Sequence, residues 1–228
     1  MALTTVLSVQ VQPDRIRAYE TLVQKLAEKA AKEDEFRWTA HQVGFGELGR
    51  IHFVARHADW SELGRRFPMN ALMEKILGAQ QAQKMEEEAN ACSAGQRYTV
   101  GVDRPDLSYP PEGREILPLA VVTLVRARSG RQDAVEELIR KVAEAIPKVD
   151  DPSRILTYQT VLGDLSTYWT VRPLEDLSDL DAQRQPADLL TEAFGPAEGG
   201  LVFRAGLEAI EQVERELLIY RPELSNPA

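Results

Sequence analysis

Two kinds of hydrophobic pattern alternate along this chain. Residues 4–12 alternate, with Leu7, Val9 and Val11 on one face and Ser8, Gln10 and Gln12 on the other, and this period of two predicts a half-buried strand. In residues 15–33 the apolar positions recur at helical spacing and form a single stripe, which predicts an amphipathic helix. Asp14 precedes this helix and is predicted to cap its N-terminus.

The same reading extends through both halves of the chain. In the first half it predicts strands at 36–45, 50–56 and 96–102, with a short helix at 70–77 and a longer polar helix through 88. In the second half it predicts strands at 120–128, 154–162, 167–172 and 216–220, with a helical stripe from 135 to 146 and a helix at 207–213. Each half therefore reads strand, helix, strand, strand, helix, strand.

A sequence repeat explains why the two halves share this order. The segment Arg104–Pro110 recurs as Arg221–Pro227 at an offset of 117 residues (221 − 104), and the same offset pairs Gln42 with Gln159 upstream. Many further positions match at this offset, including glycines, leucines and an aspartate in each half. The chain is therefore one unit written twice.

The repeated order defines the predicted fold class. A β-α-β-β-α-β unit is ferredoxin-like, and its helices cover only one face of its sheet, so the other face must be buried elsewhere. We therefore expect an α+β protein in which tandem ferredoxin-like repeats pack sheet to sheet as a pseudo-dimeric α/β barrel. The predicted boundaries are 1–104 for the first unit, 105–118 for a proline-rich linker and 119–228 for the second unit.

The second hairpin carries a family resemblance. Residues Gly163–Leu177 are similar to the hairpin-plus-turn pattern of antibiotic-biosynthesis-monooxygenase-like and NIPSNAP-like members of the dimeric α/β-barrel superfamily, here in its fused form. The resemblance implies a small-molecule-binding protein, or a cofactor-independent monooxygenase-like enzyme that acts on an apolar organic substrate. The alternative is a non-catalytic structural or interaction protein whose barrel is filled by side chains.

The positions of the histidines bear on whether the chain could bind haem. Chlorite-dismutase-like proteins resemble this fused architecture and use a histidine of the C-terminal unit as the axial iron ligand. This chain has no histidine after His57, so haem is not expected unless a tyrosine or a first-half histidine replaces that ligand. No cofactor is predicted.

The histidines are the first candidates for chemistry. His41 and His52 lie on the predicted first-half hairpin, and Tyr158 and Trp169 replace them in the second half. Because neutral histidine suits proton transfer near pH 7, we predict His41 and His52 as catalytic residues and Tyr158 and Trp169 as ligand-binding residues. The alternative is that both histidines are satisfied structurally within their strands.

One arginine is a further candidate ligand-binding residue, and the sequence contains no metal-binding motif. Arg126 occupies the position of Gln10 in the first half, and it is predicted to hold an anionic or enolate oxygen; the alternative is a solvated arginine at the barrel rim. No metal site is predicted, because His52 and His57 are five residues apart and point to opposite faces of a strand. The chain also has no H-E-x-x-H motif and only one cysteine.

The composition of the chain limits the kinds of binding partner that are expected. With 228 residues, 43% hydrophobic and 28% charged, the chain is typical of a globular protein. Its net charge of −9 argues against nucleic-acid binding and against docking on an anionic membrane. No leader or membrane-spanning run is read, and the single cysteine fits a reducing compartment, so a cytoplasmic location is expected. The apolar residues 67–69 suggest a homodimer.

Overall fold

The computed structural model describes residues 2–32, 37–67, 69–110 and 116–227. The chain divides into two compact units, each with its own set of internal contacts. Unit 1 consists of Met1–Val102 and Leu218–Ala228, and unit 2 consists of Asp103–Leu217. The last segment of the chain therefore belongs to the unit that contains the first.

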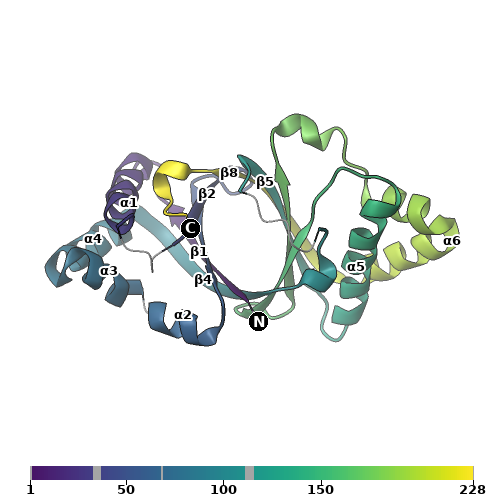
Figure 1. The fold of residues 1–228 in the computed structure, drawn as a ribbon, viewed down its shortest axis with the longest axis horizontal. Coiled ribbons are helices and arrows are strands. Elements are labelled where there is room, and N and C mark those ends of the chain that lie inside the picture. Colours follow the sequence, from purple (N-terminus) through teal and green to yellow (C-terminus); the bar gives the residue numbers. More distant parts are fainter. Residues whose placement is uncertain (1, 33–36, 68, 111–115, 228) are drawn as a thin grey trace. The chain divides into compact units, whose positions relative to one another are not determined.

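Unit 1 is built on antiparallel strands. Strand β1 pairs with both β3 and β4, and β2 pairs with β3. The helices lie on one side of these strands (Figure 1). Along this part of the chain the elements are β1 (Leu3–Val11), α1 (Ile16–Ala30), β2 (Thr39–Phe45), β3 (Arg50–His57), α2 (Trp60–Arg66), α3 (Met69–Leu77), α4 (Ala79–Cys92) and β4 (Ser93–Asp103).

Unit 2 repeats this pairing. Strand β7 pairs antiparallel with β5 and with β6. The elements that follow β4 are η1 (Pro105–Leu107), β5 (Leu119–Ala127), α5 (Gln132–Lys148), β6 (Leu156–Leu162), β7 (Thr167–Leu174), η2 (Leu177–Leu180), α6 (Pro186–Ala209), β8 (Ile210–Tyr220) and η3 (Pro222–Leu224). Strand β8 begins in unit 2 and ends in unit 1.

The eight strands follow the hydrogen-bonded order β1-β3-β2-β8-β5-β7-β6-β4, which closes into a barrel. Each half contributes the ferredoxin-like order of strands and helices. The predicted fold class, an α+β protein of two ferredoxin-like repeats in an α/β barrel, is confirmed.

The hydrophobic cores explain which strand face meets the helices. In unit 1, Val9 and Val11 of β1 pack with Tyr19 and Val23 of α1. In unit 2, Val125 of β5 packs in one cluster with residues of α5. Because side chains alternate along a strand, the neighbouring residues point the other way. We call the two sides of each sheet its helix face and its helix-free face.

The repeated Arg-Pro-x-Leu-Ser motif forms the same structure in both units, which we call the clasp. In unit 2, Arg104 donates from Nη1 to Glu136 of α5 at 2.9 Å and to Gln159 of β6 at 2.6 Å. Its Nη2 atom lies 2.7 Å from an oxygen of Asp106. Leu107, in the same motif, is fully buried.

The clasp of unit 1 is built from the C-terminal copy of the motif. Arg221 donates to Glu20 of α1 at 2.9 Å, to Glu223 at 2.6 Å and to Gln42 of β2. Leu224 is fully buried against the α1 core. Gln42 and Gln159, identical in the two repeats, are therefore structural partners of the clasp arginines.

The clasps also explain where the unit boundaries fall. The first boundary lies within two residues of the predicted one, because residues from Asp103 onward pack on unit 2. The sequence assigned residues 218–228 to the second unit, but these residues pack on unit 1. Each copy of the motif follows a strand of one half and docks on the other half, which a linear repeat does not reveal.

Two local predictions are wrong in detail, and one helix was missed. The predicted helix at 207–213 ends at Ala209, and Ile210–Val213 belongs to β8. Asp14 does not cap α1, whose N-cap residue is Arg15 without a side-chain hydrogen bond. Helix α2 was not predicted; Asp59 caps it by accepting a hydrogen bond from the backbone N–H of Glu62.

The helix before the last strand has a break that both halves share. Gly195 inside α6 has φ 82° and ψ 161°. Gly78, its repeat partner, has φ 79° and ψ 150° between α3 and α4. Only glycine adopts such angles without strain, so the repeat keeps a glycine where its second helical segment changes direction.

Candidate functional site

The two candidate histidines are direct neighbours in unit 1. His41 of β2 lies opposite His52 of β3 in the strand register. Both lie on the helix-free face, because Ala40 and Ile51 beside them belong to the core on the helix face. The hairpin therefore brings together the two residues that the sequence singled out.

Hydroxyl groups surround this histidine pair. The Oγ atom of Ser8 lies 2.8 Å from Nδ1 of His52, and the Oγ1 atom of Thr39 lies 2.9 Å from Nε2 of His41. The ring of Tyr220 is centred 5.5 Å from that of His41. We call His41, His52, Ser8, Thr39 and Tyr220 the histidine cluster.

Burial controls the charge of His41. Desolvation, with a smaller contribution from the neighbouring His52, lowers the pKa of His41 to about 4. At pH 7 the imidazole is therefore neutral, and it can both donate and accept a hydrogen bond. Its weak basicity suits it to orienting a bound group better than to removing a proton.

Sequence reasoning missed three members of the cluster for different reasons. Ser8 and Thr39 could have been found, because strict alternation places Ser8 on the helix-free face and Thr39 lies two residues before His41 on the same strand. Tyr220 could not be found by pattern alone. It reaches β2 because the C-terminal segment packs on unit 1, where the backbone N–H of Arg221 donates to the carbonyl of Ala40.

The corresponding face of unit 2 carries aromatic residues. Tyr158 of β6 lies opposite Trp169 of β7 in register, with ring centroids 6.4 Å apart. Leu124 of β5 is the neighbour of Trp169, at the position that Ser8 holds beside His52. The structure thus brings Tyr158 and Trp169 together, as it does their repeat partners.

Arg126 has carboxylate partners of its own. Its Nε atom lies 3.2 Å from Asp164 and 3.4 Å from Glu211. Both carboxylates compete with an external anion for the guanidinium group. The predicted role of Arg126 in holding an anionic oxygen has no geometric support here beyond its position on β5.

The third histidine belongs to a different environment. His57 lies on the helix face of unit 1 and is 5% exposed, with Nε2 3.1 Å from the hydroxyl of Thr5. Its Nδ1 atom has no hydrogen-bond partner among the residues that the structure describes. Desolvation, followed by the nearby Arg66, lowers the pKa of His57. His57 is therefore a buried structural histidine, separate from the histidine cluster.

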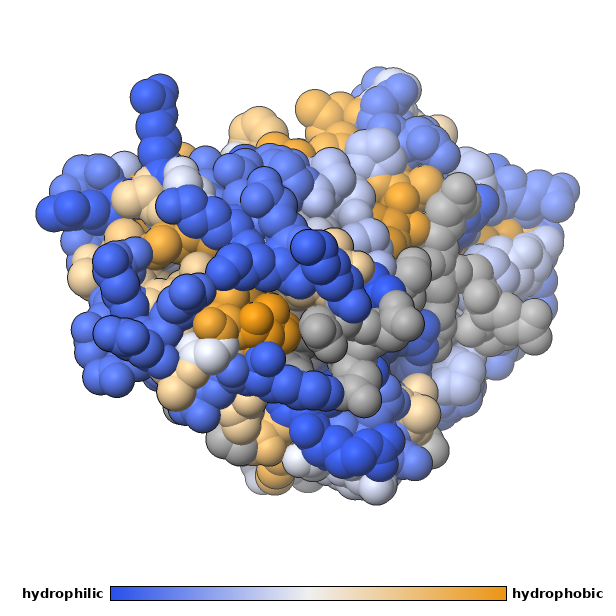
Figure 2. All heavy atoms as spheres, turned by 60° about the vertical axis from the view of Figure 1, so that its left-hand side comes forward, coloured by the Kyte–Doolittle hydropathy of each residue, from blue (hydrophilic) through white to orange (hydrophobic). Residues whose placement is uncertain are grey.

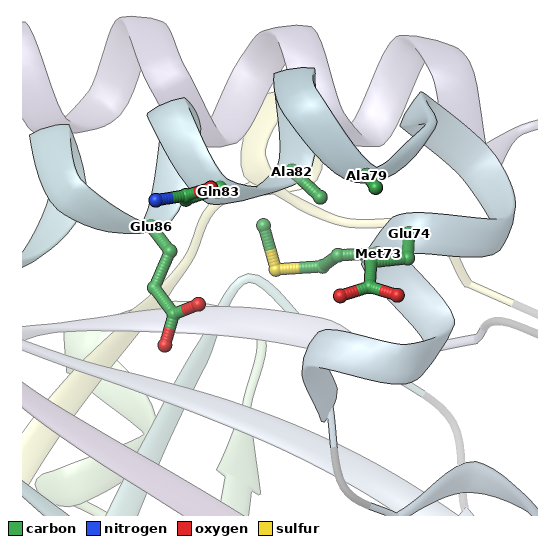
Figure 3. Close-up of a pocket in the computed structure, with 6 residues that line it drawn as sticks. All are labelled: Met73, Glu74, Ala79, Ala82, Gln83 and Glu86. Atoms are coloured by element: carbon green, nitrogen blue, oxygen red, sulfur yellow. The ribbon is translucent and has the colours of Figure 1, made fainter.

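A small surface pocket lies elsewhere in unit 1. It measures about 200 Å³ and is lined by residues of α3 and α4, with Met73 between the helices and Glu74 and Glu86 at its edge (Figure 3). This volume is below the range of about 300–1,000 Å³ that is usual for ligand sites. It contains none of the predicted site residues.

No metal centre is indicated by the described side chains. Within residues 2–32, 37–67, 69–110 and 116–227, no group of three or more His, Cys, Asp and Glu side chains could hold a metal ion. None of the helices in these same segments has the length and apolar character needed to cross a membrane.

The surface of unit 1 bears on the predicted homodimer. Its helical side is mostly hydrophilic, and hydrophobic residues form separate small patches (Figure 2). Phe67 is 59% exposed and packs edge-on to Tyr98, with ring centroids 6.1 Å apart. Pro68 and the side chain of Met69 lie outside the described part of the chain, so the homodimer stays a prediction.

Solved structures with the same fold cover nearly the whole chain. A candidate monooxygenase from Lactobacillus acidophilus NCFM has a TM-score of 0.61 at 6% identity, over 96% of this chain and 93% of that one. An anthrone oxidase-like protein has a TM-score of 0.61 at 11% identity, over 100% and 94%. The chlorite dismutase of Candidatus Nitrospira defluvii has a TM-score of 0.53 at 12% identity, over 97% and 92%.

These likenesses concern the fold, and the predicted resemblance is confirmed as a likeness of fold. Sequence comparison adds nothing to it, since no family model matches the chain and no curated protein does either. At identities of 6–12%, the likeness concerns the fold and not the activity.

The chlorite dismutase likeness requires a test for haem. Unit 2 contains no histidine, and its helix-free face presents Leu124, Tyr158 and Trp169. The ring of Tyr158 is packed near that of Trp169. These residues do not fit a haem held by a histidine of the second half.

Proposed function

We propose that this protein binds a small, largely apolar organic molecule and that the histidine cluster of unit 1 makes the polar contacts to it. The observation that carries this proposal is the cross-strand pair of His41 and His52. Two imidazoles with adjacent hydroxyls concentrate hydrogen-bonding groups on a face that meets no helix of its own unit. Such a small set of polar groups among apolar side chains is typical of ligand sites.

We further infer a cofactor-independent oxidation of the monooxygenase-like type. His52 would accept a proton from an activated C–H group of the substrate, and His41, neutral at pH 7, would hydrogen-bond to the developing oxyanion. The resulting carbanion would react with dioxygen. A CH₂ group would become a carbonyl, with one oxygen atom retained and the other leaving as water.

The test combines a substrate with matched histidine variants. Anthrone is a suitable first probe, since its activated CH₂ group has this chemistry, and oxygen consumption gives the rate. His41→Ala or His52→Ala should lower turnover by roughly 10²-fold. His57→Ala is the control, because His57 lies on the helix face; it should lower stability without changing turnover per folded molecule. Equal rates in wild type and both cluster variants would refute the proposal.

A second candidate is a non-catalytic scaffold, and one observation favours it. Each cluster histidine already has a hydroxyl partner within the protein, so both can serve as structural hydrogen-bonding residues. In that case His41→Ala and His52→Ala should each lower the free energy of unfolding by about 1–3 kcal/mol. Thermal melts run beside ligand titrations on the same variants separate the two functions.

A further inference from the structure

The helix face of unit 2 contains two arginines at positions that are apolar or aromatic in unit 1. Arg172 of β7 lies opposite Val121 of β5, and Arg215 lies on β8. Their repeat partners at an offset of 117 are Ala55 and Tyr98. In unit 1, Ala55 is partly buried against a core cluster that includes residues of α1, and Tyr98 is 37% exposed. Unit 2 therefore has cations where unit 1 has a small apolar residue and an aromatic one.

Two threonines accompany these arginines. Thr123 lies opposite Thr170 in the strand register, and the Oγ1 atom of Thr170 donates to the carbonyl of Thr123 at 3.4 Å. In unit 1 the corresponding register pair is Leu7 and Phe53. Arg172 follows Thr170 by two residues on the same face, about 7 Å along the strand.

Both guanidinium groups have only neutral partners. Arg172 donates from Nη1 to the side-chain carbonyl of Gln183 at 3.2 Å, and Arg215 donates from Nε to the hydroxyl of Thr123 at 3.3 Å. In the part of the chain that the structure describes, neither arginine has a carboxylate within ion-pair distance. Each guanidinium carries five N–H donors, so most of their hydrogen-bonding capacity remains available.

The contrast with Arg184 shows that this arrangement is not general in unit 2. Arg184 lies 3.5 Å from Asp151 and 3.2 Å from Glu192, so its charge is balanced. Desolvation lowers the pKa of Arg172; repulsion from Arg215 lowers it further, and Asp151 opposes the shift. A half-buried cation beside a second cation is unfavourable unless an anion joins them.

We propose that Arg172 and Arg215 form a binding site for a small oxyanion, a carboxylate or phosphate group, on the helix face of unit 2. The two guanidinium groups would supply charge-assisted hydrogen bonds. The hydroxyl hydrogen of Thr123 has no acceptor among the described residues and would supply a further donor. Arg215 is exposed and Arg172 is half-buried, so the anion would enter from the β8 side.

This site is independent of the histidine cluster. Arg172 lies on the same sheet face as Tyr168, which packs with α5, whereas Trp169 lies on the opposite face. The site is also confined to unit 2 and uses none of the residues assigned to the proposed oxidation. Its success or failure therefore leaves the proposed function untouched.

Calorimetric titration at constant ionic strength tests the site. One arm uses inorganic phosphate and the other uses succinate, with sodium chloride as the blank, so the arms distinguish the two kinds of oxyanion. Saturable binding in at least one arm is expected. Arg172→Gln and Arg215→Gln should each weaken it by tenfold or more, and the bound anion should raise the melting temperature of wild type more than that of either variant.

Arg128→Gln is the matched control, because Arg128 also lacks a carboxylate partner in the described structure and donates to the backbone carbonyl of Glu208. This variant should bind like wild type. If Arg172→Gln does not fold, anion binding by Arg215→Gln tests the proposal, because Arg215 is exposed. The proposal is overturned if neither anion binds saturably, or if Arg215→Gln binds as tightly as wild type.

Discussion

The two halves of this molecule keep the same clasp but differ in chemistry on both faces of their sheets. Arg104 and Arg221 make matching contacts to a glutamate of the first helix and to a glutamine of the next strand. By contrast, the histidine pair of unit 1 corresponds to Tyr158 and Trp169 in unit 2. Within a repeat, retained residues therefore identify what holds the fold, and diverged residues identify candidate sites.

The two units differ in polarity in opposite directions on the two faces of their sheets. The helix-free face is polar in unit 1, where His52 bonds to Ser8, and aromatic in unit 2, where Tyr158 lies near Trp169. The helix face is apolar around Phe53 in unit 1 and cationic around Arg172 in unit 2. Duplication thus supplied two copies of one scaffold, and each copy placed polar groups on a different side.

If the clasps are structurally equivalent, their buried leucines should contribute equally. Leu107→Ala and Leu224→Ala should each lower the free energy of unfolding by between about 3 and 5 kcal/mol, because both side chains are fully buried and truncation leaves a cavity. Urea unfolding followed by two spectroscopic probes measures this and checks that unfolding is cooperative.

Leu201→Ala is the control for this comparison, since Leu201 is 62% exposed, and its effect should stay within about 0.5 kcal/mol. A large effect at only one of the two clasp leucines would contradict the equivalence. It would mean that one copy of the motif docks less firmly than the other.

The polar face of unit 1 should make stability depend on pH in a way that its counterpart cannot. The pKa of His41 is about 4 in the folded protein and 6.5 when unperturbed. Since the folded pKa is lowered, the contribution is complete above pH 6.5 and declines toward pH 4 as the unfolded chain binds the proton first. A shift of this size corresponds to about 3 kcal/mol. Burial lowers the pKa of His57 too, which adds to the decline.

Denaturant unfolding from pH 7 to pH 4.5 measures this dependence, and the difference between wild type and a His41 variant separates it from the carboxylates that begin to protonate at the lower end of this range. His41→Gln should flatten the curve, and the position corresponding to His41 in unit 2 holds a tyrosine, Tyr158, in place of a histidine. The same slope in wild type and His41→Gln would show that His41 does not carry the effect.

The ion pairs of the clasps should differ in strength although their arginines match. Arg104→Met leaves Glu136 and Asp106 without their cation, and Arg104 lowers the pKa of both. We expect a loss of about 3 kcal/mol for Arg104→Met and about 2 kcal/mol for Arg221→Met, because the Arg104 clasp holds an additional hydroxyl. Urea unfolding measures both.

Lys84→Met controls for loss of charge at the surface. Lys84 is 77% exposed and lies 3.8 Å from Glu88 within its own helix, and such pairs contribute less than about 1 kcal/mol. A larger loss for Arg221→Met than for Arg104→Met would reverse the predicted order and exclude the hydroxyl as the cause.

The sequence predicted the fold well because the fold depends on local period and on the repeat. Alternation in β1 and helical spacing in α1 reflect directly which side chains are buried. The ends of elements were less predictable. At 210–213 the apolar residues fit a helical stripe as well as a strand, and pairing of β8 with its neighbours decided for the strand.

The candidate site was predicted only in part, because the local sequence pattern does not reveal which distant residues come into contact in the fold. His41 and His52 could be found by comparing the halves, and register then made them neighbours. Tyr220 joins them only through the docking of the C-terminal segment. The cations Arg172 and Arg215 were not predicted as a site, because the sequence does not show that these two residues lie on the same face of the folded unit.

The smallest predicted effect concerns a clasp hydroxyl of unit 2 that has no counterpart among the described residues of unit 1. The hydroxyl of Tyr168 donates to Glu136 at 2.7 Å, and its repeat partner is Ile51, which cannot form this bond. Tyr168→Phe should lower the free energy of unfolding by about 1 kcal/mol, since the ring remains in the core and only the hydroxyl's bond to Glu136 and its longer bond from Gln159, at 3.4 Å, are lost.

A double-mutant cycle makes this prediction specific. Tyr168 and Arg104 share Glu136, so Tyr168→Phe and Arg104→Met should couple by about 0.5 kcal/mol or more. Tyr168→Phe and Arg221→Met share no partner and should be additive within about 0.3 kcal/mol. Equal coupling in the two cycles would mean that Tyr168 acts through general stability. Coupling to Arg104 alone would establish the hydroxyl as the reason that two clasps with the same motif differ in strength.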